Sequence, residues 1–259
     1  MDKDFKIIDG ELVEYYGNGG DLIITDGVTS IADEAFAENL LLTGVLIPAS
    51  VRWIGDMAFR SCSNITRFEV DASNGFLCVV DGDLYTKDKT ELINYAQGKN
   101  DVSVSIPEGV TYIRNVVFKY CENLEQVSIP NTVKRIECAA FRGCTKLTRI
   151  EIPGSVEELV RWVLAECTAL TEVRLNDGTR FIGEGAFGSC TNLRDIYIPD
   201  SVENIFYDAF WGCEKLTIHA HKGSYAEEYA KENNIPFVAM GGCSMKTYEC
   251  IAHSGNTGK

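Results

Sequence analysis

A pair of residues, Ala-Phe or a close variant, returns at a fixed interval along most of the chain. The pairs fall at 35–36, 58–59, 117–118, 140–141, 163–164, 186–187 and 209–210, so neighbouring pairs are 23 residues apart except across one gap of 59. A second marker, Ile-Pro or a substitute for it, keeps the same interval. A constant period of about 20–30 residues predicts a solenoid, in which each coil buries its apolar face against its neighbours.

Each coil carries a short stretch of the form apolar-x-apolar before the proline position, as in Ile150-x-Ile152 and Ile196-x-Ile198. Alternation of period two turns the two apolar residues inward and the middle residue outward. Proline cannot donate to a strand ladder, so the strand ends there. A second apolar pair, such as Val202 with Ile205, returns the chain along another wall. The expected fold is a mostly-β repeat solenoid with one parallel strand in each 23-residue coil.

The repeats occupy 21–218, and the segments at both ends are expected to cap them. Residues 1–20 contain Asp9-Gly10 between two apolar stretches, which predicts a hairpin cap. Residues 219–240 form the C-terminal cap, where Ser224-x-x-Glu227 is a capping box that opens a helix with Tyr225 and Tyr229 on its apolar face. Residues 241–259 are polar and Gly-rich, as expected for a tail.

An insertion at about 71–101 interrupts the array. The Ile-Pro markers on its two sides are 36 residues apart, 13 more than the period, and Asp81-Gly82 within it predicts another hairpin. Such a hairpin could project from one edge as a binding element. It could also plug a local gap with its alternating apolar residues, and this second arrangement is favoured.

Six of the ten cysteines occupy one position of the repeat. They are Cys62, Cys121, Cys144, Cys167, Cys190 and Cys213, each three residues after the second residue of the Ala-Phe pair. In stacked parallel coils the Cα–Cβ bonds of these cysteines point in the same direction and do not converge, which disfavours disulfides between coils. A column of buried, reduced thiols is therefore expected.

The net charge of −14 argues against binding to nucleic acid or to an anionic membrane surface. The sequence has no apolar run of transmembrane length, and residues 1–10 lack the apolar core of a secretion signal. As written, the chain is expected in the cytoplasm; if a leader has been removed, it is a cell-surface or secreted protein.

The sequence predicts no enzyme, cofactor or metal site. Gly183 to Gly188 match GxGxxG, but this motif occupies a repeat position and no βαβ unit surrounds it. Two sets of residues are considered as metal ligands: His219 with His221, and Cys243 with Cys250 and His253. Both sets are weak candidates for a metal site. No serine elbow, phosphate loop or catalytic Cys/His signature occurs.

The outward strand positions remain as a candidate ligand-facing surface. Opposite charges alternate between neighbouring coils there, with Arg149 beside Glu172 and Glu151 beside Arg174, and no aromatic platform is expected. Trp162 could anchor a partner, although repacking around the smaller Leu164 explains its coil equally well and is preferred. The surface comprises Arg67, Glu69, Gln126, Arg149, Glu151, Glu172, Arg174, Asp195 and Tyr197.

The repeat unit resembles the BspA-like leucine-rich repeat family. The resemblance covers about 21–218 and is carried best by Ile182-Gly183, Ala186-Phe187, Cys190, Leu193, Ile196, Ile198-Pro199 and Val202. It implies a right-handed solenoid and, in exported relatives, adhesion or the binding of host proteins, with no shared catalytic residues.

Three hypotheses of function follow. The first is a monomeric, non-catalytic module for protein interaction or adhesion, whose partner is a protein or, alternatively, a glycan. The second is an intracellular structural scaffold without a dedicated ligand. The third and most distant is a metal- or thiol-dependent enzyme.

Overall fold

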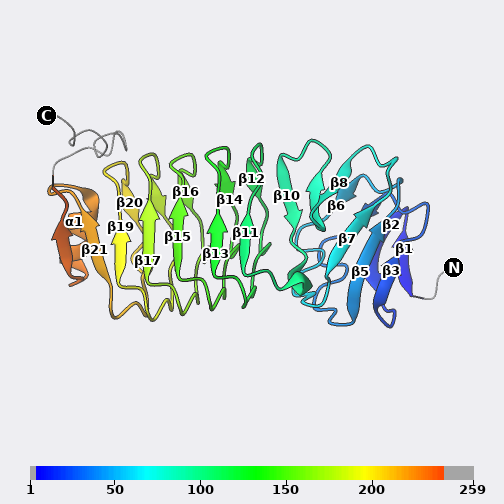
Figure 1. Cartoon of the computed structure of the whole chain (residues 1–259), viewed down its shortest axis with the longest axis horizontal. Helices are drawn as coiled ribbons and strands as arrows, with labels where there is room; N and C mark the ends of the chain where they lie inside the picture. Colours follow the sequence, from blue (N-terminus) through cyan, green and yellow to red (C-terminus); the bar gives the residue numbers. More distant parts are fainter. Residues whose placement is uncertain (1–3, 242–259) are drawn as a thin grey trace, which may run out of the picture.

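The coils stack side by side into an elongated solenoid with β1 (Phe5–Ile8) and α1 (Tyr225–Glu232) at opposite ends of the stack (Figure 1). The computed structural model describes residues 4–241. The predicted apolar-x-apolar segments form one side of the solenoid, here called the strand wall, and pair in parallel with register between neighbouring coils. Its strands are β3 (Gly20–Ile23), β5 (Leu42–Ile47), β7 (Arg67–Val70), β11 (Ser103–Ser105), β13 (Gln126–Ser128), β15 (Arg149–Ile152), β17 (Glu172–Leu175), β19 (Asp195–Tyr197) and β21 (Thr217–Ala220).

The second apolar pair of each coil lies on an opposite side, the return wall. The second residue of each pair and the residue before it pair in parallel between coils, as two-residue strands, so most coils contribute a strand to each wall rather than to one wall alone. These strands are β4 (Ser30–Ile31), β6 (Trp53–Ile54), β12 (Tyr112–Ile113), β14 (Arg135–Ile136), β16 (Glu158–Leu159), β18 (Phe181–Ile182) and β20 (Asn204–Ile205).

The Ala-Phe segments form the turns that close each coil and line up as the turn edge. Each turn holds residues with a left-handed backbone at matching positions, such as Trp162 (φ 57°) and Glu166 (φ 62°). This conformation aims their N–H groups at the next coil: Trp162 donates to the Glu184 carbonyl at 3.0 Å and Glu166 to the Gly188 carbonyl at 2.7 Å. Hydrogen bonds between coils therefore continue along the turn edge, where no strand is present.

The phenylalanines of the turns stack along the interior. The rings of Phe118 and Phe141 lie 5.0 Å apart and 3° from parallel, and those of Phe187 and Phe210 lie 5.3 Å apart. Leu164 fills the position between these two pairs and is completely buried. The repacking around this leucine is as expected.

The six repeat cysteines form the predicted buried column. All six are buried, and the eight cysteines within residues 4–241 are free thiols. Five of the six donate to the carbonyl of the phenylalanine position one coil earlier, at 3.0–3.2 Å, for example Cys167 to Phe141. Burial raises the pKa of the Cys62 thiol to about 11.

The insertion forms three antiparallel strands, β8 (Leu77–Val80), β9 (Asp83–Thr86) and β10 (Glu91–Asn94), followed by a short 3₁₀ helix (Gln97–Lys99). It does not project: Leu84 and Ile93 belong to the core of the N-terminal coils, whereas Tyr85 and Leu92 belong to that of the C-terminal coils. The insertion thus lies between two separate cores and joins them. Of the two arrangements considered, the structure has the one that fills a gap.

This insertion also repeats the construction of the N-terminal cap, where β1 (Phe5–Ile8) and β2 (Glu11–Tyr15) form the predicted hairpin. β2 pairs in parallel with β4 as β10 pairs with β12. Tyr15 then packs on Phe36 at 5.4 Å, and Tyr95 packs on Phe118 at 4.9 Å. The second array therefore begins with a cap of its own.

Helix α1 (Tyr225–Glu232) and β22 (Phe237–Ala239) close the C-terminal end. Ser224 accepts a hydrogen bond from the Glu227 N–H, and Glu227 pairs with Lys231 at 3.0 Å, as predicted. The buried face of α1 consists of Ala226, Tyr229 and Ala230. The inclusion of Tyr225 in that face was wrong, because it is 37% exposed.

Candidate functional site

The outward columns on the strand wall have the predicted register. Arg149, Glu172 and Asp195 lie opposite one another on β15, β17 and β19, and Glu151, Arg174 and Tyr197 form the neighbouring column. These six residues share one sheet. Gln126 lies on β13, whereas Arg67 and Glu69 lie on β7, before the insertion. The structure thus brings six of the nine candidate residues into one surface.

Ion pairs hold these long side chains in place. Glu172 accepts from Arg174 at 2.8 Å and lies 3.9 Å from Arg149, and Glu151 accepts from Asn176 at 2.9 Å. On β7, Arg67 contacts Glu69 at 2.8 Å and Asp21 at 2.7 Å. The hydrogen bond from Arg67 is the main reason that the pKa of Asp21 lies below its usual value.

Three planar groups stack on the strand wall. The Arg174 guanidinium lies 4.2 Å from the centre of the Tyr197 ring, and that ring stacks on the His219 imidazole at 4.6 Å and 21°. Asp195 fixes the imidazole through a 2.7 Å contact with its Nε2. The expectation that no aromatic platform exists was therefore wrong. We call Arg174, Tyr197 and His219 the stacked platform.

His219 was missed as part of this surface because the last coil is one residue short. Tyr197 lies opposite His219, 22 residues later, whereas a step of 23 leads to Ala220. The alternation in β21, with Ile218 and Ala220 buried, was the signal that turns His219 outward. Where the length of the repeat changes, the alternation of apolar and polar residues within the strand shows which side chains point outward.

The residues considered as metal ligands have other partners or lie outside the described structure. Nδ1 of His221 contacts Asp200 at 2.9 Å, in the same way that His219 contacts Asp195. Within residues 4–241, no three His, Cys, Asp or Glu side chains converge as a metal site would require. Cys243, Cys250 and His253 lie outside the described residues.

A second cluster of large side chains lies on the turn edge. Trp162 is half-buried, with the guanidinium groups of Arg161 and Arg142 at 3.7 and 5.3 Å from its ring. Trp162 and Trp211 line a hollow of about 240 Å³, and Trp211 is 71% exposed. The sequence singled out Trp162 but missed Trp211.

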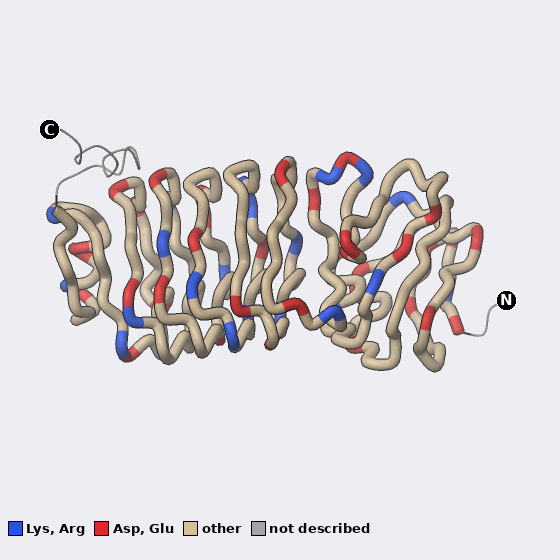
Figure 2. The backbone as a smooth tube through the Cα atoms, viewed as in Figure 1, with Lys and Arg blue, Asp and Glu red and all other residues tan. Residues whose placement is uncertain are grey.

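Charges of both signs are distributed along the whole solenoid (Figure 2). Neither wall carries a continuous basic stripe of the kind that binds nucleic acid. Within residues 4–241, no helix has the length and apolar character needed to cross a bilayer.

The sequence profile of the BspA type leucine rich repeat region matches six copies in this chain, over 8–76 and 94–217. The chain belongs to the BspA-type leucine-rich repeat family. The gap between the matched regions coincides with most of the insertion, which explains why the repeat pattern is lost there. No curated protein matches the sequence.

Solved structures of three other proteins share the fold. A leucine-rich cell surface protein of Faecalibacterium prausnitzii is 32% identical over 80% of this chain, with a TM-score of 0.73. The pneumococcal vaccine antigen PcpA and a leucine-rich repeat protein of Eubacterium ventriosum are each 22% identical, with TM-scores of 0.67 and 0.66 over 84% and 81% of this chain. The alignments cover 54%, 61% and 72% of those proteins, respectively, so this chain spans little more than half of the first.

Proposed function

We propose that the chain is a non-catalytic, monomeric protein-interaction module that acts in adhesion. The observation that carries this proposal is the stacked platform on the strand wall. Arg and Tyr are enriched at the energetically dominant positions of protein interfaces, and here both are already held in one conformation. A partner that docks on them would lose little of its binding energy to side-chain ordering.

The platform is suited to a protein partner with both apolar and polar groups. The Tyr197 ring lies between Arg174 and His219 and offers its edge and hydroxyl, while Glu172 and Asp195 beside it offer carboxylates that can accept further hydrogen bonds. Family membership supports an interaction role, and the chain contains no catalytic motif. The alternative of a structural scaffold without a ligand does not require ordered side chains on this wall.

Binding to a panel of purified extracellular-matrix and cell-surface proteins, measured by biolayer interferometry, tests this function. We expect at least one partner with micromolar or tighter affinity, and about tenfold weaker binding by the double variant Arg174→Ala, Tyr197→Ala. The matched control is Arg180→Ala, Glu203→Ala, which removes an exposed pair with a 2.8 Å contact beside the return wall. Equal loss in the control, or no partner in the panel, would contradict the proposal.

We also propose a location at the cell surface. The similarity to the F. prausnitzii cell surface protein supports it. The test is antibody labelling of intact and lysed cells that express the natural gene. Labelling confined to lysed cells would instead favour the intracellular scaffold.

A further inference from the structure

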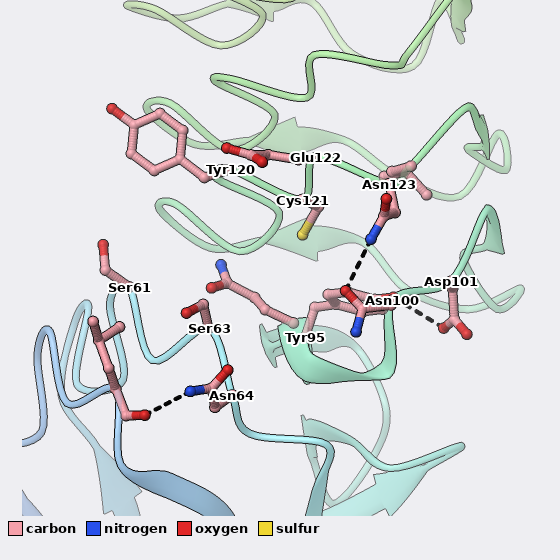
Figure 3. A pocket seen from close by; sticks show the side chains of 13 residues that line it. Ser61, Ser63, Asn64, Tyr95, Asn100, Asp101, Tyr120, Cys121, Glu122 and Asn123 are labelled. Atoms are coloured by element: carbon pink, nitrogen blue, oxygen red, sulfur yellow. Dashed lines mark hydrogen bonds between the residues drawn. The ribbon is translucent and has the colours of Figure 1, made fainter.

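The boundary between the two arrays contains a hollow of about 550 Å³ on the turn edge (Figure 3). Ser61, Ser63 and Asn64 line it from the last turn before the insertion, and Tyr120, Glu122 and Asn123 from the first turn after it. The 3₁₀ helix and the residues that follow it supply the remaining part, including Asn100 and Asp101. The hollow therefore exists because the insertion separates two turns that would otherwise be adjacent.

The separation also interrupts the hydrogen bonds along the turn edge. In other coils the residue two positions after the phenylalanine position donates to the next turn: Glu38 to the Arg60 carbonyl at 2.7 Å, and Tyr120 to the Arg142 carbonyl at 2.8 Å. Ser61 occupies this position before the insertion, and its N–H has no acceptor among residues 4–241. The Lys119 carbonyl, its counterpart across the gap, accepts from the Gln97 side chain instead, at 2.8 Å. One edge of the hollow thus retains a free backbone donor.

The side chains around the hollow are rich in hydroxyl and amide groups. The hydroxyls of Ser61 and Ser63 make no hydrogen bond to another described residue. Asn123 donates to Asn100 at 3.0 Å and accepts from the Lys146 ammonium at 2.8 Å, and Asn64 donates to the Leu40 carbonyl at 2.6 Å. Each amide still has capacity for at least one further hydrogen bond. These groups can both donate to and accept from a ligand.

The charge of the lining favours a neutral ligand over an anionic one. None of the described residues that line the hollow is basic, and Asp101 and Glu122 are both acidic. Asp101 already accepts from the Tyr95 hydroxyl at 2.9 Å and lies 3.4 Å from the Lys99 ammonium, whereas Glu122 is exposed without a basic partner among residues 4–241. Phosphate, sulfate or a sialylated glycan would meet these carboxylates, whereas the neighbouring ammonium groups of Lys99 and Lys146 are already engaged, by Asp101 and by the Asn123 Oδ1 atom.

The rim supplies the apolar contact that a polar ligand still needs. Tyr120 is 45% exposed and Leu40, on the other side of the gap, is 55% exposed. A pyranose ring has the matching properties, because it carries hydroxyls around its edge and C–H groups on its faces. The volume lies within the range of about 300–1,000 Å³ that is typical of small-ligand sites.

We propose that this hollow is a binding site for a neutral saccharide. The ligand class is one or two uncharged sugar residues, at the end of or within a glycan. Its hydroxyls accept from the Ser61 N–H and exchange hydrogen bonds with Ser63, Asn64 and Asn123, while a sugar face packs against Leu40 and the edge of the Tyr120 ring. The site is distinct from the stacked platform and does not depend on the protein partner proposed above.

The test uses the full chain on an array of neutral oligosaccharides that includes maltotriose, cellotriose, mannotriose and N,N′-diacetylchitobiose, followed by calorimetry of any sugar retained. We expect a dissociation constant of about 1 mM or lower for at least one sugar. Asn123→Ala and Asn64→Ala should each weaken binding about fivefold or more.

Asn192→Ala is the matched control. Asn192 occupies the same position of the repeat as Asn123, two residues after the cysteine, and donates to the Thr168 carbonyl at 2.8 Å away from the hollow. The control should bind sugar as the wild type does. Sugar binding that is equally weakened by Asn192→Ala, binding unaffected by Asn123→Ala and Asn64→Ala, or retention of no neutral sugar would overturn the assignment. Selective retention of a polar peptide in place of every sugar would also overturn it.

Discussion

The indole ring of Trp162 lies directly over Gly185, the residue at the same position of the next coil. A Cβ atom built on Gly185 would lie 2.6 Å from Trp162 Cδ1, closer than any normal contact, and Gly185 also has a left-handed backbone with φ 54°. The same arrangement recurs between Tyr120 and Gly143, where φ is 74°. On the turn edge, an aromatic residue in one coil therefore requires a glycine in the next.

We expect Gly185→Ala to destabilise the protein for two separable reasons. The left-handed backbone alone costs an alanine about 1–2 kcal/mol, and the contact with the indole adds to this. In the Trp162→Ala background the second contribution disappears. The free energy of unfolding, measured by urea denaturation of the four proteins of this cycle, should show a coupling of about 0.5–3 kcal/mol.

Gly27→Ala is the control for that cycle. Gly27 has φ 92°, and its Cβ would meet no atom within 4 Å, so the substitution changes only the backbone energy. Its effect should be the same with and without Trp162. A coupling near zero for Gly185→Ala would show that the indole moves aside freely.

Substitutions of Phe141 in the interior column should destabilise the protein in proportion to the volume that they remove. Its ring is completely buried and stacked on Phe118, so Phe141→Ala should cost about 3–5 kcal/mol by leaving a cavity. Leu164 shows that a leucine fits the same position of the repeat one coil later. Phe141→Leu should accordingly cost less than half as much, as judged from denaturation midpoints. Equal losses would mean that ring stacking, rather than filled volume, stabilises the column.

The repeat was predictable from the sequence because each coil meets nearly the same surroundings. An inward Ile150 or a buried Cys167 needs only the period and the alternation, which fix its neighbours in adjacent coils. For the same reason the opposite placement of Arg149 and Glu172 followed from their positions in consecutive units. These inferences required no information on contacts outside the repeat.

The structural features that the sequence did not predict lie where the 23-residue repeat is interrupted or shortened. The platform member His219 follows a shortened coil, and the hollow lies beside the insertion, where two turns separate. One signal was overlooked: Leu12 and Tyr15 of the first cap recur as Leu92 and Tyr95, each followed by a turn into the array. That likeness indicates a second cap. The depth of the hollow next to it depends on side-chain packing that a sequence pattern does not specify.

A buried carboxyl in the insertion predicts a pH dependence. Asp83 accepts from the Ala96 N–H at 2.9 Å and from Lys99 at 2.8 Å, yet burial outweighs both and raises its pKa from 3.8 to about 6. Since the folded-state pKa is the higher one, this contribution to stability is fully present below pH 3.8 and is lost as the pH rises through about 6.

Asp83→Asn should therefore remove part of the decrease in stability between pH 4 and pH 7. We expect the difference between variant and wild type to shift in favour of the variant by about 1–3 kcal/mol over this interval, measured by urea denaturation at several pH values. The exposed Asp26→Asn is the control and should leave the pH profile unchanged. A parallel profile for Asp83→Asn would show that Lys99 compensates for the burial of this carboxylate.

The cysteine column predicts an order of thiol reactivity. Alkylation requires an accessible thiolate. Burial blocks access to the column thiols and raises the pKa of the Cys62 thiol to about 11. Cys167 is completely buried, and its pKa lies well above the ordinary value, chiefly because of burial. Cys78 and Cys138, by contrast, are only half-buried.

Iodoacetamide at pH 8 should therefore modify Cys78 and Cys138 in the native protein well before any cysteine of the column, as followed by peptide mass spectrometry. In denaturant the eight cysteines within residues 4–241 should react at similar rates, which controls for differences between the peptides. The column thiols should become reactive only at the rate at which the array opens, since neighbouring coils cover each one. Fast native labelling of Cys144 or Cys167 would mean that the coils separate readily, and that the stack is held together less tightly than its buried thiols and rings imply.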